Sequence, residues 1–160
     1  SGLNGWKLVL AGGSEIGADA YVKKIKKMVK GKSIEIIESP SFKNIKELYG
    51  NAKIFWSAAG FNIDEEKTPH KVEHFGIAVV EAMSAGCVPF VVKRGGHKEI
   101  IEDKINGFLW ESLDELQSLT NAVIYNERRI GEIAKNAEAT SGQYSEERFA
   151  KSVTQLVENN

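Results

Sequence analysis

The sequence contains a single cysteine, Cys87, among its 160 residues. One thiol can form neither an internal disulfide nor a multi-thiolate metal site, and a reducing compartment fits best. Apolar runs such as residues 88–92 are far shorter than the ~20 residues that a membrane-spanning helix needs. The N-terminus also lacks the basic segment and apolar stretch of a signal peptide. We therefore expect a cytoplasmic protein, and peripheral attachment of a full-length protein to a membrane stays open.

An excess of charge of one sign is also lacking. The 21 basic and 22 acidic residues leave a formal net charge of −1, so no global field favours nucleic acid as the partner. A small-molecule ligand is expected instead. With 42% apolar residues the chain can bury one core, so a single domain over residues 1–160 is the default. The strand pattern begins almost at the first residue, as in a domain cut from a longer chain.

Apolar patterning predicts alternating strands and helices. Short apolar runs predict strands, and apolar residues at helical spacing predict helices. The predicted strands cover residues 6–11, 34–37, 52–57, 88–92 and 107–110, and the predicted helices cover residues 18–30, 44–51, 76–85, 97–102, 112–125, 127–139 and 145–158, with Ser112 as an N-cap. Strands separated by helices pair in parallel through right-handed crossovers. The predicted fold class is α/β, with a Rossmann-like, doubly wound parallel sheet.

In such sheets ligands bind beyond the carboxyl ends of the strands, so the loops that follow the strands are expected to line one crevice. These loops contain Gly12-Gly13, residues 38–41, residues 58–74 and residues 94–97. The segment 58–74 shows neither the helical nor the strand spacing of apolar residues. It is also long for a loop in a compact domain, which is typical of a functional loop.

The most informative segment is residues 73–86, where Gly76 opens a predicted helix between two glutamates. A glycine permits close approach to the backbone, and the first-turn amides of a helix suit a phosphate. Glu81 could accept hydrogen bonds from both hydroxyls of a ribose, and Glu73 from a sugar. The alternative interpretation is an exposed Glu81 and a Glu73 favoured only by the helix dipole. The apolar neighbours of Glu81 predict a substantially buried carboxylate.

The order of these residues resembles a known signature. Residues 73–89 read Glu-His-Phe-Gly-Ile-Ala-Val-Val-Glu-Ala-Met-Ser-Ala-Gly-Cys-Val-Pro, and Gly-Gly-His-Lys-Glu-Ile-Ile at 95–101 and Asn-Gly-Phe at 106–108 follow. This pattern resembles that of the retaining group-1 glycosyltransferases, glycosyltransferase family 4. Residues 7–13 and 47–56 resemble the same domain. The resemblance implies a GT-B enzyme of two Rossmann-like domains, in which residues 1–160 form the C-terminal nucleotide-sugar (donor) domain and the N-terminal acceptor domain is absent from the chain.

The resemblance also implies roles for single residues. Glu81 would bind the ribose, Glu73 would orient the donor sugar, and the backbone of residues 75–77 would hold the sugar and diphosphate, while residues 38–40 would border the base. Glu73 is therefore the catalytic candidate. The donor-binding candidates are Gly12, Gly13, Glu38, Ser39, Pro40, Glu73, Phe75, Gly76, Ile77 and Glu81.

The implied reaction is transfer of a hexose from GDP-mannose or a UDP-sugar to a glycan or lipid-linked acceptor, with retention of configuration. The family generally needs no metal, so no metal or other cofactor is expected. The family's basic pair, an arginine and a lysine that grip the donor phosphates, lies upstream of the first strand, and nothing before Lys7 supplies it. The isolated chain is therefore expected to bind donor weakly and to be inactive.

Two alternatives stay open: a non-catalytic nucleotide-sugar binding module and a GT-B-fold sugar-nucleotide epimerase. A dehydrogenase is disfavoured because residues 12–17 lack the dinucleotide-binding glycine pattern. His70, His74 and His97 show no paired metal-ligand spacing, and His97 either approaches the donor phosphate or caps its helix. Cys87 is expected to be a small, buried packing residue.

Overall fold

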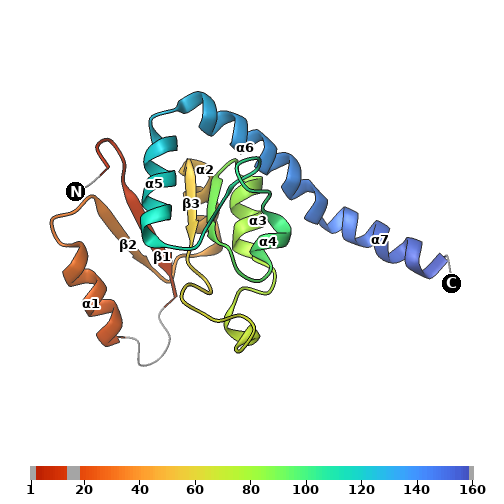
Figure 1. The fold of residues 1–160 in the computed structure, drawn as a ribbon, viewed down its shortest axis with the longest axis horizontal. Coiled ribbons are helices and arrows are strands. Elements are labelled where there is room, and N and C mark those ends of the chain that lie inside the picture. The colour runs from red at the N-terminus through yellow and green to blue at the C-terminus, as the bar shows by residue number, and fades with distance from the viewer. Residues whose placement is uncertain (1–2, 14–18, 159–160) are drawn as a thin grey trace. The chain divides into compact units, whose positions relative to one another are not determined.

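The computed structural model describes residues 3–13 and 19–158 of the chain (Figure 1). They fall into two compact units, Ser1–Leu48 and Tyr49–Asn160, which are described separately. Residue 18, the predicted start of the first helix, and residues 14–17 of the glycine-containing loop lie outside the described residues.

The first unit contains a pair of parallel strands joined through a helix. Strand β1 (Leu8–Gly12) pairs with β2 (Ile34–Glu38), and α1 (Asp19–Val29) lies between them in the sequence and contacts β2. The register places Gly12 opposite Glu38, so the carboxyl ends of both strands meet at one edge. Strand β1 begins later than predicted because the Trp6 N–H donates to the Leu3 carbonyl at 3.1 Å and closes a turn there. Helix α2 (Phe42–Asn51) begins in this unit and ends in the second.

The second unit holds a parallel sheet of three strands in the order β3-β4-β5. These strands are β3 (Ile54–Ser57), β4 (Val88–Val92) and β5 (Phe108–Trp110). Every residue of the central strand β4 is buried. A continuous apolar run is typical of a parallel strand covered on both faces, which explains why β4 lacks the alternation of a half-exposed strand.

Helices connect and cover these strands. They are α3 (Ile77–Ser84), α4 (His97–Ile100), α5 (Leu113–Ile124), α6 (Glu127–Ser141) and α7 (Glu146–Glu158), with 3-10 turns η1 (Pro69–Lys71) and η2 (Gly142–Tyr144). Figure 1 shows α3 beside α6, and both contact β4, while α5 contacts β5 and α6. The predicted cap of α5 is confirmed, since the Ser112 hydroxyl accepts from the Glu115 N–H at 3.1 Å.

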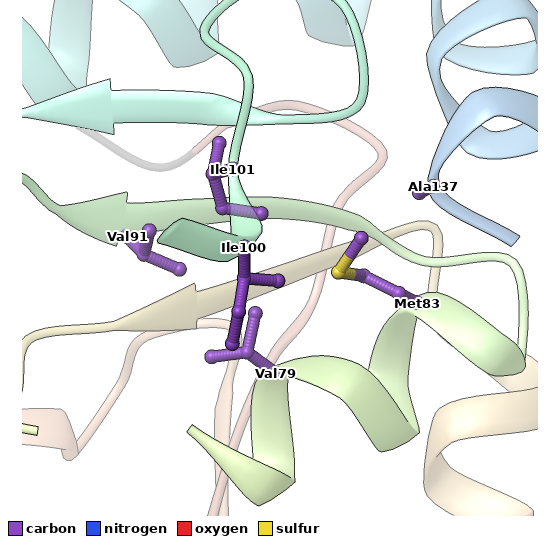
Figure 2. Close-up of a cluster of buried hydrophobic side chains, with 6 residues drawn as sticks. All are labelled: Val79, Met83, Val91, Ile100, Ile101 and Ala137. Atoms are coloured by element: carbon purple, nitrogen blue, oxygen red, sulfur yellow. The ribbon is translucent and has the colours of Figure 1, made fainter. Parts of the chain in front are cut away.

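A cluster of buried apolar side chains joins α3 to its neighbours (Figure 2). Val79 and Met83 come from α3, Val91 from β4 and Ala137 from α6, while Ile100 ends α4 and Ile101 follows it. Burying such side chains stabilises a fold by about 1.5–3 kcal/mol each. The cluster therefore anchors α3, whose N-terminus carries the candidate site, to the rest of the unit.

The predicted fold class is confirmed: the chain is α/β, all strand pairs in the described residues are parallel, and helices lie between the strands. Helix α4 ends at Ile100, two residues earlier than predicted, because Ile101 adopts an extended conformation with φ −100° and ψ 117°. Over residues 3–13 and 19–158, none of the helices is long and apolar enough to cross a membrane.

Candidate functional site

The N-terminus of α3 is built around Gly76, which is buried and has a φ of 105°. This left-handed conformation favours glycine. A Cβ at this position would lie 3.4 Å from Val79 Cγ2, 3.5 Å from His97 Cδ2 and 3.6 Å from Glu73 Cγ. Among the described residues, no side chain caps α3, so the amides of its first turn and the positive end of its dipole can meet a ligand.

The glycine pair Gly95-Gly96 supports the segment that leads into α3. The Gly96 N–H donates to the Glu73 carbonyl at 2.8 Å. A Cβ on Gly95 would overlap the Glu73 carbonyl oxygen, and a Cβ on Gly96 would overlap that of His74. Gly95 also has a φ of 51°. Only glycines therefore allow residues 73 and 74 to lie directly on this loop, which fixes the backbone of Glu73.

His97 lies beneath the same helix end and is fully buried. Its Nδ1 is 2.9 Å from the Val92 carbonyl, and because a carbonyl only accepts, Nδ1 carries the proton. Burial lowers the pKa of His97, and the charge of Glu73 opposes that effect only in part. In a neutral imidazole of this tautomer Nε2 is an acceptor, and it finds no partner among the described residues. The cap of α4 is Gly96, so the capping role predicted for His97 is wrong, while its approach to the donor phosphate stays a prediction.

The two predicted glutamates differ in their surroundings. Glu73 is partly buried in the segment before α3, whereas Glu81 is exposed on α3. The expectation of a buried Glu81 is wrong, because its apolar neighbours Ala82 and Met83 face the core, and Glu81 lies on the opposite side of the helix. Burial raises the pKa of the Tyr49 phenol, and the charge of Glu81 raises it further. Glu81 therefore presents its carboxylate to solvent with the Tyr49 phenol nearby.

The side chains of Phe75 and Ile77 lie at the surface. Phe75 is 42% exposed, and its ring meets that of Tyr144 edge-on at 5.3 Å, while Ile77 is 67% exposed. The roles predicted for residues 75–77 belong to their backbone, which these side-chain positions do not test.

The remaining predicted donor-binding residues lie in the first unit. Gly12 and Gly13 are exposed, and the Ser39 N–H donates to the Gly12 carbonyl at 2.8 Å. Ser39 has a φ of 49°, which turns the chain away from β2 towards Pro40. The Glu38 carboxylate pairs with the Lys26 ammonium. The structure thus brings the loops after β1 and β2 together within this unit, as the topology predicts.

Sequence reasoning missed Glu65, in the long loop before α3. Its Oε2 accepts from the Gly95 N–H at 2.8 Å, and its Oε1 lies 2.6 Å from Lys98 Nζ. The Gly95 amide, followed by Lys98, lowers the pKa of Glu65. The available signal was the acidic run at residues 64–66 in a loop predicted to face residues 94–97.

A hollow of about 450 Å³ opens beside this contact. Its lining residues are Asn62, Ile63, Asp64, Glu65, Glu66 and Arg94, and no predicted site residue is among them. The Arg94 guanidinium donates to Glu111 at 3.0 Å, and this contact, with Lys93, lowers the pKa of Glu111. The hollow is thus walled by carboxylates and one arginine that already has an acidic partner.

Parallel strands with helical crossovers, and a helix that starts at a buried glycine beyond them, define a Rossmann-like domain. The family model described as "Glycosyl transferases group 1" matches residues 3–139. The chain therefore belongs to the group 1 glycosyl transferases, and the resemblance in its sequence is confirmed.

Several known proteins resemble the chain. A GDP-Man:Man(3)GlcNAc(2)-PP-Dol alpha-1,2-mannosyltransferase of Mus musculus is 31% identical over 149 residues, which span 89% of this chain and 29% of that protein. The crystal structure of Anabaena HepE in complex with UDP-glucose matches with a TM-score of 0.79 and 22% identity, over 99% of this chain and 42% of that one. The C-terminal domain of LpcC, a group 1 family protein of Francisella tularensis, matches with a TM-score of 0.73 and 23% identity, over 88% of this chain and 71% of that one.

The structural matches identify the fold as that of the C-terminal Rossmann-like domain of GT-B glycosyltransferases. The chain spans under a third of the mouse relative and under half of HepE.

Proposed function

We propose that this chain holds the nucleotide-sugar donor of a retaining glycosyltransferase. The complete enzyme would transfer a hexose from GDP-mannose or a UDP-sugar to a glycan or lipid-linked acceptor, and the acceptor would bind to a part of the protein outside this chain. The observation that carries the proposal is the start of α3, where Glu73, the left-handed Gly76 and an uncapped helical turn lie together.

The helix start suits the diphosphate. Its uncapped amides and the positive end of the helix dipole favour an anion, and Gly76 carries no side chain that would keep the ligand from the backbone. As the bond from the sugar to the diphosphate breaks, negative charge grows on the leaving group. Amides fixed before the reaction stabilise that charge without reorganising.

Glu73 and Glu81 would hold the two ends of the donor. Glu73 lies in the segment just before α3, and the Gly96 N–H holds its carbonyl, so its carboxylate can orient the hydroxyls of the sugar. Glu81 follows Ile77 by four residues, about 6 Å along the helix axis. A donor that lies along α3 with its diphosphate at the helix start would then bring its ribose to the exposed carboxylate of Glu81.

Two comparisons inform the choice of donor. The name of the mouse relative specifies GDP-mannose, and HepE was solved with UDP-glucose. Because they differ in both base and sugar, the test includes both classes of nucleotide.

Calorimetric titration of the chain with UDP, GDP, UDP-glucose and GDP-mannose tests the proposal. We expect metal-independent binding of one nucleotide class. Glu81→Ala should weaken this binding by about 1.5–3 kcal/mol, or about 10- to 150-fold, as expected for a lost charged hydrogen bond.

Glu138→Ala is the matched control, since Glu138 is an exposed helical glutamate like Glu81 but lies on α6, away from the start of α3. It should bind as the unmodified chain does. Binding that Glu81→Ala leaves unchanged would contradict the assigned site.

A further inference from the structure

The loop between β3 and α3 carries Glu65 on a turn that is closed by its neighbours. The Asp64 carboxylate accepts from the N–H groups of Glu66 and Lys67 at 3.2 and 3.3 Å, and the Thr68 hydroxyl donates to the Asp64 carbonyl at 3.0 Å. These local bonds occupy Asp64 and leave the Glu65 carboxylate to bind a distant partner.

That partner is the loop after β4 that contains Gly95 and Gly96, here called the double-glycine loop. Oε2 of Glu65 accepts from the Gly95 N–H, and Oε1 pairs with Lys98, over separations of 30 and 33 residues in the sequence. The side chain of Glu65 is only 30% exposed, so solvent screens these contacts less than those of a fully exposed ion pair. The Gly95 amide therefore binds an anion that belongs to the protein itself.

The adjacent amide holds the other end of the same loop. The Gly96 N–H donates to the Glu73 carbonyl. The Val72 side chain fits between Gly60 and Gly95: a Cβ added to Gly60 would lie 3.1 Å from Val72 Cγ1, and a Cβ added to Gly95 would lie 2.9 Å from Val72 Cγ2. Two neighbouring amides thus clamp the loop at residues 65 and 73.

We propose that Glu65 is a positioning residue for Glu73: its carboxylate occupies the Gly95 amide as an internal anion and thereby holds the Gly96 amide on the Glu73 carbonyl. The double-glycine loop then serves as a support for the long loop and does not receive the donor phosphate, which is left to the start of α3. The link from Glu65 to donor binding rests on the proposed function, whereas the link to the Glu73 backbone does not.

Amide hydrogen exchange of the 160-residue chain, followed by NMR, tests the first link. Glu65→Ala should accelerate exchange of the Gly96 N–H by at least about tenfold, because a charged hydrogen bond on the adjacent residue is lost. Glu65→Gln retains an oxygen for the Gly95 N–H and should have a smaller effect. Glu66→Ala removes the neighbouring acid but keeps its backbone N–H, which donates to the Asp64 carboxylate, so it should leave the exchange unchanged.

Titration of the same variants with UDP-glucose and GDP-mannose tests the second link. The dissociation constant should rise by about tenfold in Glu65→Ala and stay constant in Glu66→Ala, since small displacements of a positioned group have large effects. Unchanged Gly96 exchange in Glu65→Ala would overturn the proposal, as would faster exchange with unchanged donor affinity. If the unmodified chain binds neither nucleotide sugar, the proposed function fails, and the exchange measurement still decides whether Glu65 holds Glu73 in place.

Discussion

Replacing Gly96 by alanine should separate the steric role of the double glycine from backbone strain. Gly96 has φ −62° and ψ −18°, a conformation that alanine adopts without cost, so the effect must come from the added methyl group. A Cβ there would lie 2.8 Å from the His74 carbonyl carbon and 2.9 Å from Phe75 Cα. Both are backbone atoms of the segment that leads into α3, and they can yield only if that segment moves.

The magnitude follows from three contributions. Overpacking costs about 1–3 kcal/mol, and loss of the Gly96 N–H bond to Glu73 costs about 0.5–1.5 kcal/mol. The lower entropy of the unfolded alanine chain offsets about 0.4–1 kcal/mol. The free energy of unfolding should therefore fall by about 0.5–4 kcal/mol, and donor binding should weaken because Glu73 is displaced.

Urea denaturation, followed by tryptophan fluorescence and circular dichroism, measures the change against two control glycines. Gly86→Ala adds a methyl group with nothing within 4 Å but at a φ of 81°, so it should cost about 1–2 kcal/mol while leaving donor binding intact. Gly131→Ala lies in α6, also with nothing within 4 Å, and should stabilise the chain by about 0.5–1 kcal/mol. A Gly96→Ala variant as stable as Gly131→Ala would refute the reasoning.

Three further predictions concern the same unit. Burial lowers the pKa of His97 from 6.5, so the unfolded chain binds a proton at this residue before the folded chain does. The free energy of unfolding should therefore fall as the pH drops below about 6.5, by up to ~1.4 kcal/mol per pH unit. Urea midpoints between pH 7.5 and 5.5 should show this slope, and a His97→Gln variant should lose it. Burial raises the pKa of Cys87 to about 11, so a disulfide reagent at pH 8 should react only as urea opens the structure, and reaction at the rate of a free thiol would contradict this. Ser112→Ala should lower the thermal stability by about 1 kcal/mol through loss of the α5 cap, as measured by calorimetry.

Local sequence determined the elements of this protein. The apolar run at residues 88–92 coincides with β4, and the position of Ser112 before an apolar helical period predicts the start of α5. Glycine at position 76 also marks the start of α3. These features depend on the spacing of neighbouring residues, which the sequence displays directly. The family resemblance was equally local, since it rests on short motifs in a fixed order.

The tertiary structure decided which side chains face the core, the solvent or each other. Apolar neighbours favoured burial of Glu81, yet the rotation of α3 against β4 and α6 leaves its carboxylate exposed. The contact between Glu65 and Gly95 joins residues 30 positions apart, and no local period encodes such a pair. The tautomer of His97 likewise depends on the Val92 carbonyl, which lies 2.9 Å from Nδ1. Spacing along the chain specifies hydrogen bonds within an element, whereas the partner of a side chain depends on which distant backbone the packing brings within about 3 Å.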